Sequence, residues 1–270
     1  MNEGNRNINI EHPEVWDLLV MIEGMQVKYI LHTPSVEGSL IIGQVSCTDA
    51  TLQSLEDAIY DTPVLLGEYR SVKVLVHSDH FVLLPVQTTP DDCQLLVSQA
   101  FPGDDGDVVV GELPGGQAKL ACLVQPGLQA FLGRTFNYPE VYHHLFPLCG
   151  YYRELNHGTE LSRMFLNLRA TGMDMAIYCG GNLQCANSYA FENADDAAYF
   201  ALNAWRTHGL DQLTDELQLT GDNDVRAAMT PVLRQYVKFV MPAVYPAAAM
   251  RLGRNAMQAP LELILLALCE

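Results

Sequence analysis

The order of predicted elements runs twice through the chain, and this repeat restricts the fold more than any other feature. Residues 17–22 (DLLVMI) are typical of an apolar strand, and a Glu-Gly turn joins them to a second strand at 25–33. A third strand candidate follows at 39–47. A helical pattern at 48–61 and a strand at 72–76 complete this first copy.

The second half of the chain predicts the same order of elements. Strands at 164–170, 173–179 and 182–190 are separated by turn signals at Thr171-Gly172 and Gly180-Gly181. A helix follows, which Asn193 caps and Gly209 ends, and its first turn contains acidic residues. A strand at 216–220 and a helix at 224–240 come next.

A strand–hairpin–strand–helix unit that occurs twice indicates a duplicated ribonuclease-H-like topology, which is the actin-like ATPase architecture of the α/β class. We therefore predict two subdomains with mixed sheets, 1–156 and 157–270, with the boundary in the polar segment 156–159 (NHGT). The stretch 101–116 (FPGDDGDVVVGELPGG) is acidic and glycine-rich, and we expect a flexible insert of the first subdomain there. This insert would be either a solvent-exposed loop without a function or a loop that binds a partner.

Four short segments carry a resemblance to a known family. They are NSYAF at 187–191, ADDAAYF at 194–200, LQLTGD at 217–222 and LALCE at 266–270. On these residues the chain resembles the bacterial domain-of-unknown-function family 3822, whose fold is that of actin-like ATPases. The pattern is also similar to that of pilus-assembly and secretion actin-like proteins. The resemblance implies a fold, and it implies no established activity.

Actin-like ATPases bind phosphates between two β-hairpins whose first strands end in Asp-x-Gly, and the resemblance implies the same place here. Both acids are missing, because Ile22 and Ala170 stand two residues before the turn glycines. Competent ATP hydrolysis is therefore not expected. Six residues would line a vestigial site for ATP and Mg²⁺ in a cleft between the subdomains: Glu23, Gly24, Gly172, Asp174, Gly221 and Asp222.

Gly180-Gly181 invites comparison with a phosphate-binding loop. The pair joins the second and third strands of the repeat, whereas the phosphate hairpin joins the first and second. We predict an ordinary hairpin turn in which glycines supply positive φ angles.

Other polar clusters have structural interpretations that outweigh catalytic ones. His77-Ser-Asp-His80 (residues 77–80) would be a solvated turn, although a metal site is conceivable. Residues 142–144 (YHH) precede Cys149 on a helical pattern at 139–148, so a histidine could activate a thiol. No basic residue adjoins Cys149 to lower the thiol pKa, so we expect a core thiol. Residues 195–196 (DD) suit a helix start.

The chain is acidic, with a formal net charge of −17 that disfavours nucleic acid and anionic membrane surfaces as partners. Apolar runs are too short to cross a bilayer, and no signal peptide is visible. Seven scattered cysteines without a CxxC pair favour reduced thiols and a cytoplasmic location.

Taken together, the sequence predicts an actin-like protein that is degenerate in nucleotide hydrolysis and acts as a protein-binding scaffold without a cofactor. The alternative is an ATP-binding protein or weak ATPase that uses the cleft, with Asp174, Asp222 or Asp224 replacing the missing acids. An unrelated α/β hydrolase has no support from any motif, since no G-x-S-x-G occurs.

Overall fold

The computed structural model describes residues 10–269, and these form two compact units. Unit 1 comprises the chain up to Pro147 together with the residues from Pro246 on, and unit 2 is Leu148–Tyr245. The C-terminal segment thus groups with the first unit, whereas the sequence placed all residues after 156 in the second subdomain. The reason is that α7 (Leu261–Leu268) contacts the central strand of the first sheet.

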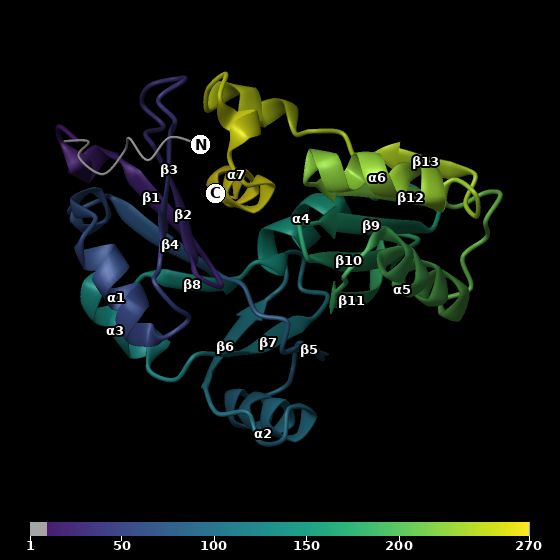
Figure 1. Cartoon of the computed structure of the whole chain (residues 1–270), viewed down its shortest axis with the longest axis horizontal. Coiled ribbons are helices and arrows are strands. Elements are labelled where there is room, and N and C mark those ends of the chain that lie inside the picture. The colour runs from purple at the N-terminus through teal and green to yellow at the C-terminus, as the bar shows by residue number, and fades with distance from the viewer. Residues whose placement is uncertain (1–9, 270) are drawn as a thin grey trace. The chain divides into compact units, whose positions relative to one another are not determined.

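Unit 1 is built on a five-stranded sheet with the order β3-β2-β1-β4-β8 (Figure 1). Strands β1 (Asp17–Glu23), β2 (Gln26–His32) and β3 (Ile41–Ser46) are antiparallel neighbours. Strands β4 (Ser71–Val76) and β8 (Glu140–His143) run parallel to β1. Nearly every residue of β1 is buried, as an apolar strand covered on both faces should be.

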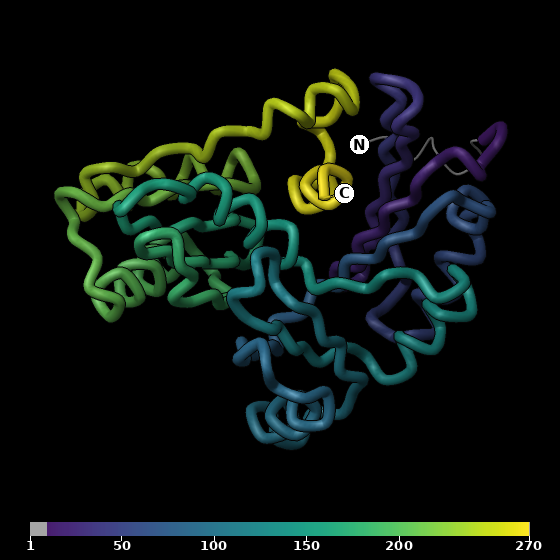
Figure 2. The backbone as a smooth tube through the Cα atoms, turned by 180° about the vertical axis from the view of Figure 1, so that it is seen from behind, coloured from purple at the N-terminus to yellow at the C-terminus, as the bar shows by residue number. Residues whose placement is uncertain are grey.

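Helices cover both faces of this sheet. Helices α1 (Leu52–Tyr60) and α3 (Leu128–Thr135) lie side by side on one face, and α7 lies on the other (Figures 1 and 2). The rings of Tyr60 and Phe131 meet edge to face at 5.8 Å between α1 and α3. Short 3₁₀ turns connect or flank these elements at Pro13–Val15, Pro63–Leu66, Ala247–Arg251 and Ala256–Gln258.

A second, three-stranded sheet in unit 1 has the order β5-β7-β6 and is antiparallel. Its strands are β5 (Phe81–Leu84), β6 (Asp107–Glu112) and β7 (Lys119–Val124), and α2 (Pro90–Ala100) packs on them. A small core of Cys93, Val97 and Ala121 joins helix to sheet. The stretch 101–116, expected to be a flexible insert, therefore contains strand β6 and the turn that leads to β7.

Unit 2 has one five-stranded sheet with the order β11-β10-β9-β12-β13. Its strands are β9 (Arg163–Leu168), β10 (Gly172–Cys179), β11 (Asn182–Ala190), β12 (Glu216–Gly221) and β13 (Phe239–Pro242). The first three are antiparallel neighbours, and β12 and β13 run parallel to β9.

The chain passes from unit 1 to unit 2 within α4 (Leu145–Leu155). Two further helices, α5 (Ala194–Thr207) and α6 (Asn223–Leu233), pack against each other and against the sheet of unit 2. Trp205 of α5 is 2% exposed within this core, and burial of so large a side chain stabilises the unit by about 3 kcal/mol.

Counted along the chain, the strands of both sheets follow the same spatial order, third-second-first-fourth-fifth. The predicted duplication of a ribonuclease-H-like unit is therefore confirmed. The fifth strand of each sheet was missed, because the sequence predicted helices at 139–148 and 224–240 where β8 and β13 occur. Segments of four residues are too short for their periodicity to separate strand from helix.

The Gly180-Gly181 pair forms the hairpin turn between β10 and β11, as predicted. Both residues have positive φ, +55° and +78°, and the flanking Cys179 and Asn182 are paired across the hairpin. Two consecutive residues with positive φ match the right-handed twist of the strands, which explains the choice of glycine.

Candidate functional site

In unit 2, the carboxyl ends of β9 and β12 and the start of β10 meet at one edge of the sheet. The register pairs Asn167 with both Asp174 and Thr220, and it pairs Leu168 with Gly221. The structure thus brings together the four residues that the sequence predicted for this half of the site: Gly172, Asp174, Gly221 and Asp222.

Asp174 is 1% exposed, and its carboxylate is held by three side chains of its own unit. Arg169 Nη2 donates to one oxygen at 3.0 Å, and Ser188 Oγ donates to the same oxygen at 2.7 Å. Asn167 Nδ2 donates to the other oxygen at 3.2 Å. The carboxylate is therefore neutralised by a guanidinium within the same unit.

The hydrogen bonds continue from Asp174 into the interior of unit 2. Thr220 Oγ1 donates to Asn167 Oδ1 at 3.1 Å, and the hydroxyls of Tyr152 and Thr220 lie 2.9 Å apart. A buried polar network in which members satisfy one another is stable and rigid. Neither Arg169 nor Asn167 was singled out in the sequence, because their link to Asp174 depends on strand register.

Gly221 and Asp222 also have structural roles. Gly221 has φ +88°, and a Cβ atom there would lie 2.0 Å from the carbonyl oxygen of Leu168, so only glycine fits between β12 and β9. Asp222 caps α6, since its Oδ1 accepts hydrogen bonds from the N–H groups of Asp224 at 2.8 Å and Val225 at 3.0 Å.

The turn predicted at Thr171-Gly172 lies one residue earlier. Gly172 begins strand β10 in an extended conformation, and Ala170-Thr171 form the two-residue turn. Arg169 N–H donates to the carbonyl oxygen of Gly172 at 2.8 Å and closes it. The backbone at this turn therefore lacks the left-handed glycine that the sequence suggested.

In unit 1, strand β1 ends at Glu23, and the two-residue turn to β2 is Gly24-Met25, one residue later than predicted. Glu23 accepts from Lys28 Nζ at 2.6 Å across the hairpin. Gly24 has φ +55°, and no atom lies within 4 Å of the position that a Cβ would take. The turn backbone is thus accessible on this side.

A cavity of about 510 Å³ opens beside that turn, at the carboxyl ends of β1 and β4. Asp49, Asp104, Asp105, His77 and His80 contribute polar groups to its wall, and no lysine or arginine of the described chain does so. Ile22, Leu55, Val76, Leu123 and Leu128 are among its apolar lining residues. No sequence signal indicated this cavity beyond the acidic character of 101–116, because its walls come from segments far apart in the chain.

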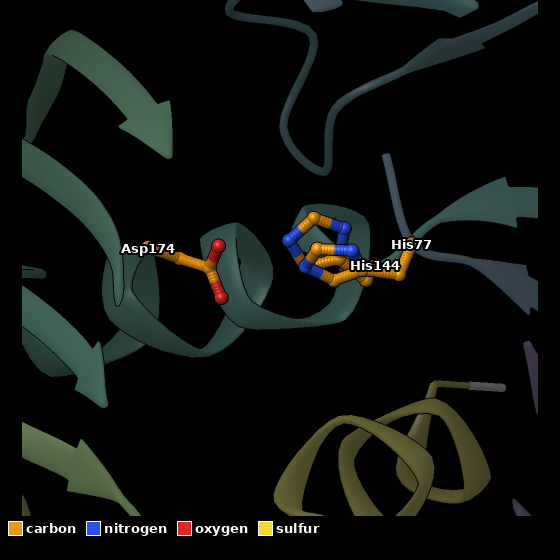
Figure 3. Close-up of side chains that lie close together, drawn as sticks. All are labelled: His77, His144 and Asp174. Atoms are coloured by element: carbon orange, nitrogen blue, oxygen red, sulfur yellow. The ribbon is translucent and has the colours of Figure 1, made fainter. Parts of the chain in front are cut away.

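Histidines gather on the same side of unit 1. The rings of His77 and His144 stack at 4.0 Å between centroids with 27° between their planes (Figure 3). His143 Nε2 lies 2.8 Å from the carbonyl oxygen of Ser78. Asp79 and His80 are exposed, as the prediction of a solvated turn requires, whereas His77 is half-buried. The prediction therefore describes only part of this turn.

Cys149 has the environment of a core thiol. It is 1% exposed, and burial raises the pKa of its thiol to about 12. A thiol with so high a pKa is protonated at neutral pH and is a poor nucleophile. The hypothesis of a cysteine nucleophile therefore has no support from this residue's environment.

Comparison with known proteins identifies the fold. A family model described as "Protein of unknown function (DUF3822)" matches residues 5–240. A protein of Bacteroides thetaiotaomicron VPI-5482 with actin-like ATPase fold and unknown function superposes with a TM-score of 0.81 at 18% identity, over 96% of this chain and 97% of that chain. The PilM–PilN type IV pilus biogenesis complex gives a TM-score of 0.53 at 10% identity, over 95% of this chain and 98% of that chain. No curated protein matches the sequence.

The predicted actin-like ATPase fold is therefore confirmed. Between residues 10 and 269, no helix combines the length and the hydrophobicity needed to span a bilayer. The six predicted site residues fall into two groups, two at the β1–β2 turn of unit 1 and four at the strand ends of unit 2. Their binding of ATP or Mg²⁺ stays a prediction.

Proposed function

We propose that this chain, which belongs to the DUF3822 family of proteins of unknown function, is a non-catalytic actin-like scaffold that binds another protein. The observation that carries the proposal is the state of Asp174. Its carboxylate accepts hydrogen bonds from Arg169, Asn167 and Ser188, so this candidate replacement for the missing acids is already bonded within its own unit. A carboxylate in that state is a poor ligand for Mg²⁺, which needs a free oxygen in octahedral geometry.

The charge in unit 1 supports the same proposal. The cavity beside Gly24 is lined by three aspartates and by no described lysine or arginine. A triphosphate carries several negative charges and requires cations or a metal to offset them. Residue 22, where the fold's metal-holding acid belongs, is a buried isoleucine. Without a metal, the aspartates would repel the phosphates.

Protein binding is the role that such a fold retains when its chemistry is lost. PilM, which shares the fold, is described in a complex with PilN. We place this chain in the cytoplasm, where reducing conditions suit its seven free cysteines. The accessible backbone at Gly24 favours the alternative of residual nucleotide binding, and calorimetric titration with ATP tests it.

The proposal is tested by two measurements on the full chain. Phosphate release from Mg-ATP should stay at the level of a buffer control, while an active actin-like ATPase is turned over in parallel. The tagged chain, crosslinked in the cell of origin, should retain one protein in a fixed stoichiometric ratio. Turnover above the control, or recovery of the chain alone, would contradict the proposal.

A further inference from the structure

The cavity in unit 1 has a composition that selects for one kind of ligand. Its carboxylates come from two loops that fold together: Asp49 precedes α1, and Asp104 and Asp105 lie between α2 and β6. Its volume of about 510 Å³ lies within the range of about 300–1,000 Å³ that is usual for ligand pockets. It is large enough for more than one amino-acid side chain.

Hydrogen bonds favour the charged form of one carboxylate in the wall. Thr51 donates to Asp49 Oδ1 from its hydroxyl at 2.5 Å and from its backbone N–H at 2.8 Å, and these bonds lower the pKa of that carboxyl. Asp104 Oδ2 lies 3.1 Å from Nδ1 of His80, which stacks on Phe101. Three carboxylates thus face two histidines, and described lysines and arginines take no part in the wall.

Apolar side chains form the rest of the wall. Ile22 comes from the end of β1, Leu55 from α1 and Leu128 from α3. A site with apolar surface and a few converging charges binds an amphipathic group of opposite charge. A nucleotide has the wrong sign, and a bare metal ion would leave the apolar surface uncovered.

We propose that this cavity receives a lysine or arginine side chain, with an adjacent apolar residue, from a basic segment of the partner protein. The inference rests on the proposed function and adds the chemistry of the bound segment. Charge complementarity extends beyond the cavity, since the whole chain carries a net charge of −17. The electrostatic field of a negatively charged protein increases the association rate of a basic segment.

The test uses a fluorescent peptide, Leu-Arg-Leu-Arg-Leu, and a twin in which citrulline replaces both arginines. Citrulline has nearly the shape of arginine and no charge. We expect saturable binding of the arginine peptide to the full chain by fluorescence anisotropy, and at least tenfold weaker binding of the citrulline twin. Raising the salt from 0.15 to 0.5 M should weaken binding, because salt screens charge pairs.

The matched variants locate the site. Asp104→Asn combined with Asp105→Asn removes two charges from exposed positions of the cavity wall, and binding should fall at least tenfold. Glu37→Gln combined with Glu68→Gln removes two charges from exposed positions of unit 1 outside the cavity, and binding should change less than twofold. The circular dichroism spectra of the unchanged chain and of both double variants should match, since every substituted residue is exposed.

Three outcomes of the peptide measurements overturn the inference, namely no binding of the arginine peptide, equal binding of both peptides, or equal loss in the two variants, and a fourth comes from the crosslinked partner. Its failure is separable from failure of the scaffold proposal. If the crosslinked partner is retained in full by the Asp104/Asp105 variant, the scaffold stands and the cavity is not its docking site. If Mg-ATP is hydrolysed, the scaffold proposal fails whatever the peptides do.

Discussion

The two units have the same strand order and differ at the ends of their strands. In unit 2 the polar groups at that edge bond to one another, and Asp174 is held by Arg169 inside the unit. In unit 1 the equivalent edge opens into a cavity, and three exposed aspartates are among its lining residues. One topology can therefore either close its polar groups into a network or present them to a ligand, and the choice is made by a few side chains.

The two units should differ most in the stability that they lose when an acidic residue of a β-hairpin is replaced, Asp174 in unit 2 and Glu23 in unit 1. Asp174→Ala leaves the Arg169 guanidinium without its carboxylate, and loss of one partner of a buried ion pair costs about 3–5 kcal/mol. Glu23→Ala removes an ion pair with Lys28 that is about a quarter to a third exposed, so its cost should stay below about 1 kcal/mol.

Tryptophan fluorescence can follow the units separately during urea unfolding. The chain has two tryptophans, Trp16 in unit 1 and Trp205 in unit 2. In a Trp16→Phe background, Asp174→Ala should lower the midpoint seen by Trp205 strongly. Equal effects of the Asp174 and Glu23 substitutions would show that the buried network of unit 2 contributes no special stability.

The turn glycines sharpen the comparison. Gly221→Ala meets both a left-handed φ and a Cβ clash with Leu168, so we expect a loss of at least about 2 kcal/mol. Gly24→Ala meets only the unfavourable φ in open space, and about 1 kcal/mol is expected. Thermal unfolding of both variants measures the difference, and a larger effect at Gly24 would contradict the close approach of β9 and β12.

Acid should weaken an ion pair of unit 1. Burial raises the pKa of Asp17, but hydrogen bonds from Arg70 and Ser71 outweigh it, so the pKa is lowered overall. Ionised Asp17 therefore stabilises the fold above its unfolded pKa of about 3.9, and this contribution is lost as pH falls through the folded value. Asp17→Asn should destabilise more at pH 7 than at pH 3, by urea unfolding. An equal effect at both values would exclude the ion pair as the cause.

A helix cap in each unit should have a modest effect on stability. Asp222→Ala removes the cap of α6, and Thr51→Ala removes the cap of α1, whose hydroxyl accepts from Ser54 N–H. Each should cost about 1 kcal/mol. If Asp222 served only as a cap, Asp222→Asn, which retains a capping oxygen, should restore most of the loss; no restoration would indicate another role for its charge.

The sequence predicted the repeated core of each unit because most of its strands are long apolar segments and turn signals separate them. Strands β8 and β13 were missed since each has four residues and owes its conformation to pairing with β4 or β12. Tertiary pairing of this kind leaves no local pattern.

The candidate site was predicted only in part, for a related reason. Gly221 and Asp222 were named as residues of a vestigial nucleotide site, whereas in the structure they form a close strand contact and a helix cap. The bonds of Asp174 to Arg169 and Ser188 depend on strand register, and the cavity depends on loops more than fifty residues apart in the chain. Contacts between segments far apart in the chain are the hardest to predict from a single sequence.

Titration calorimetry of the full chain with ATP, with and without Mg²⁺, tests the central claim most directly. We expect no saturable heat at micromolar nucleotide, because both metal-binding acids are missing and Asp174 is already bonded within its unit. Saturable micromolar binding that requires Mg²⁺ and is lost in Asp174→Asn would contradict the claim and identify the chain as a nucleotide-binding protein.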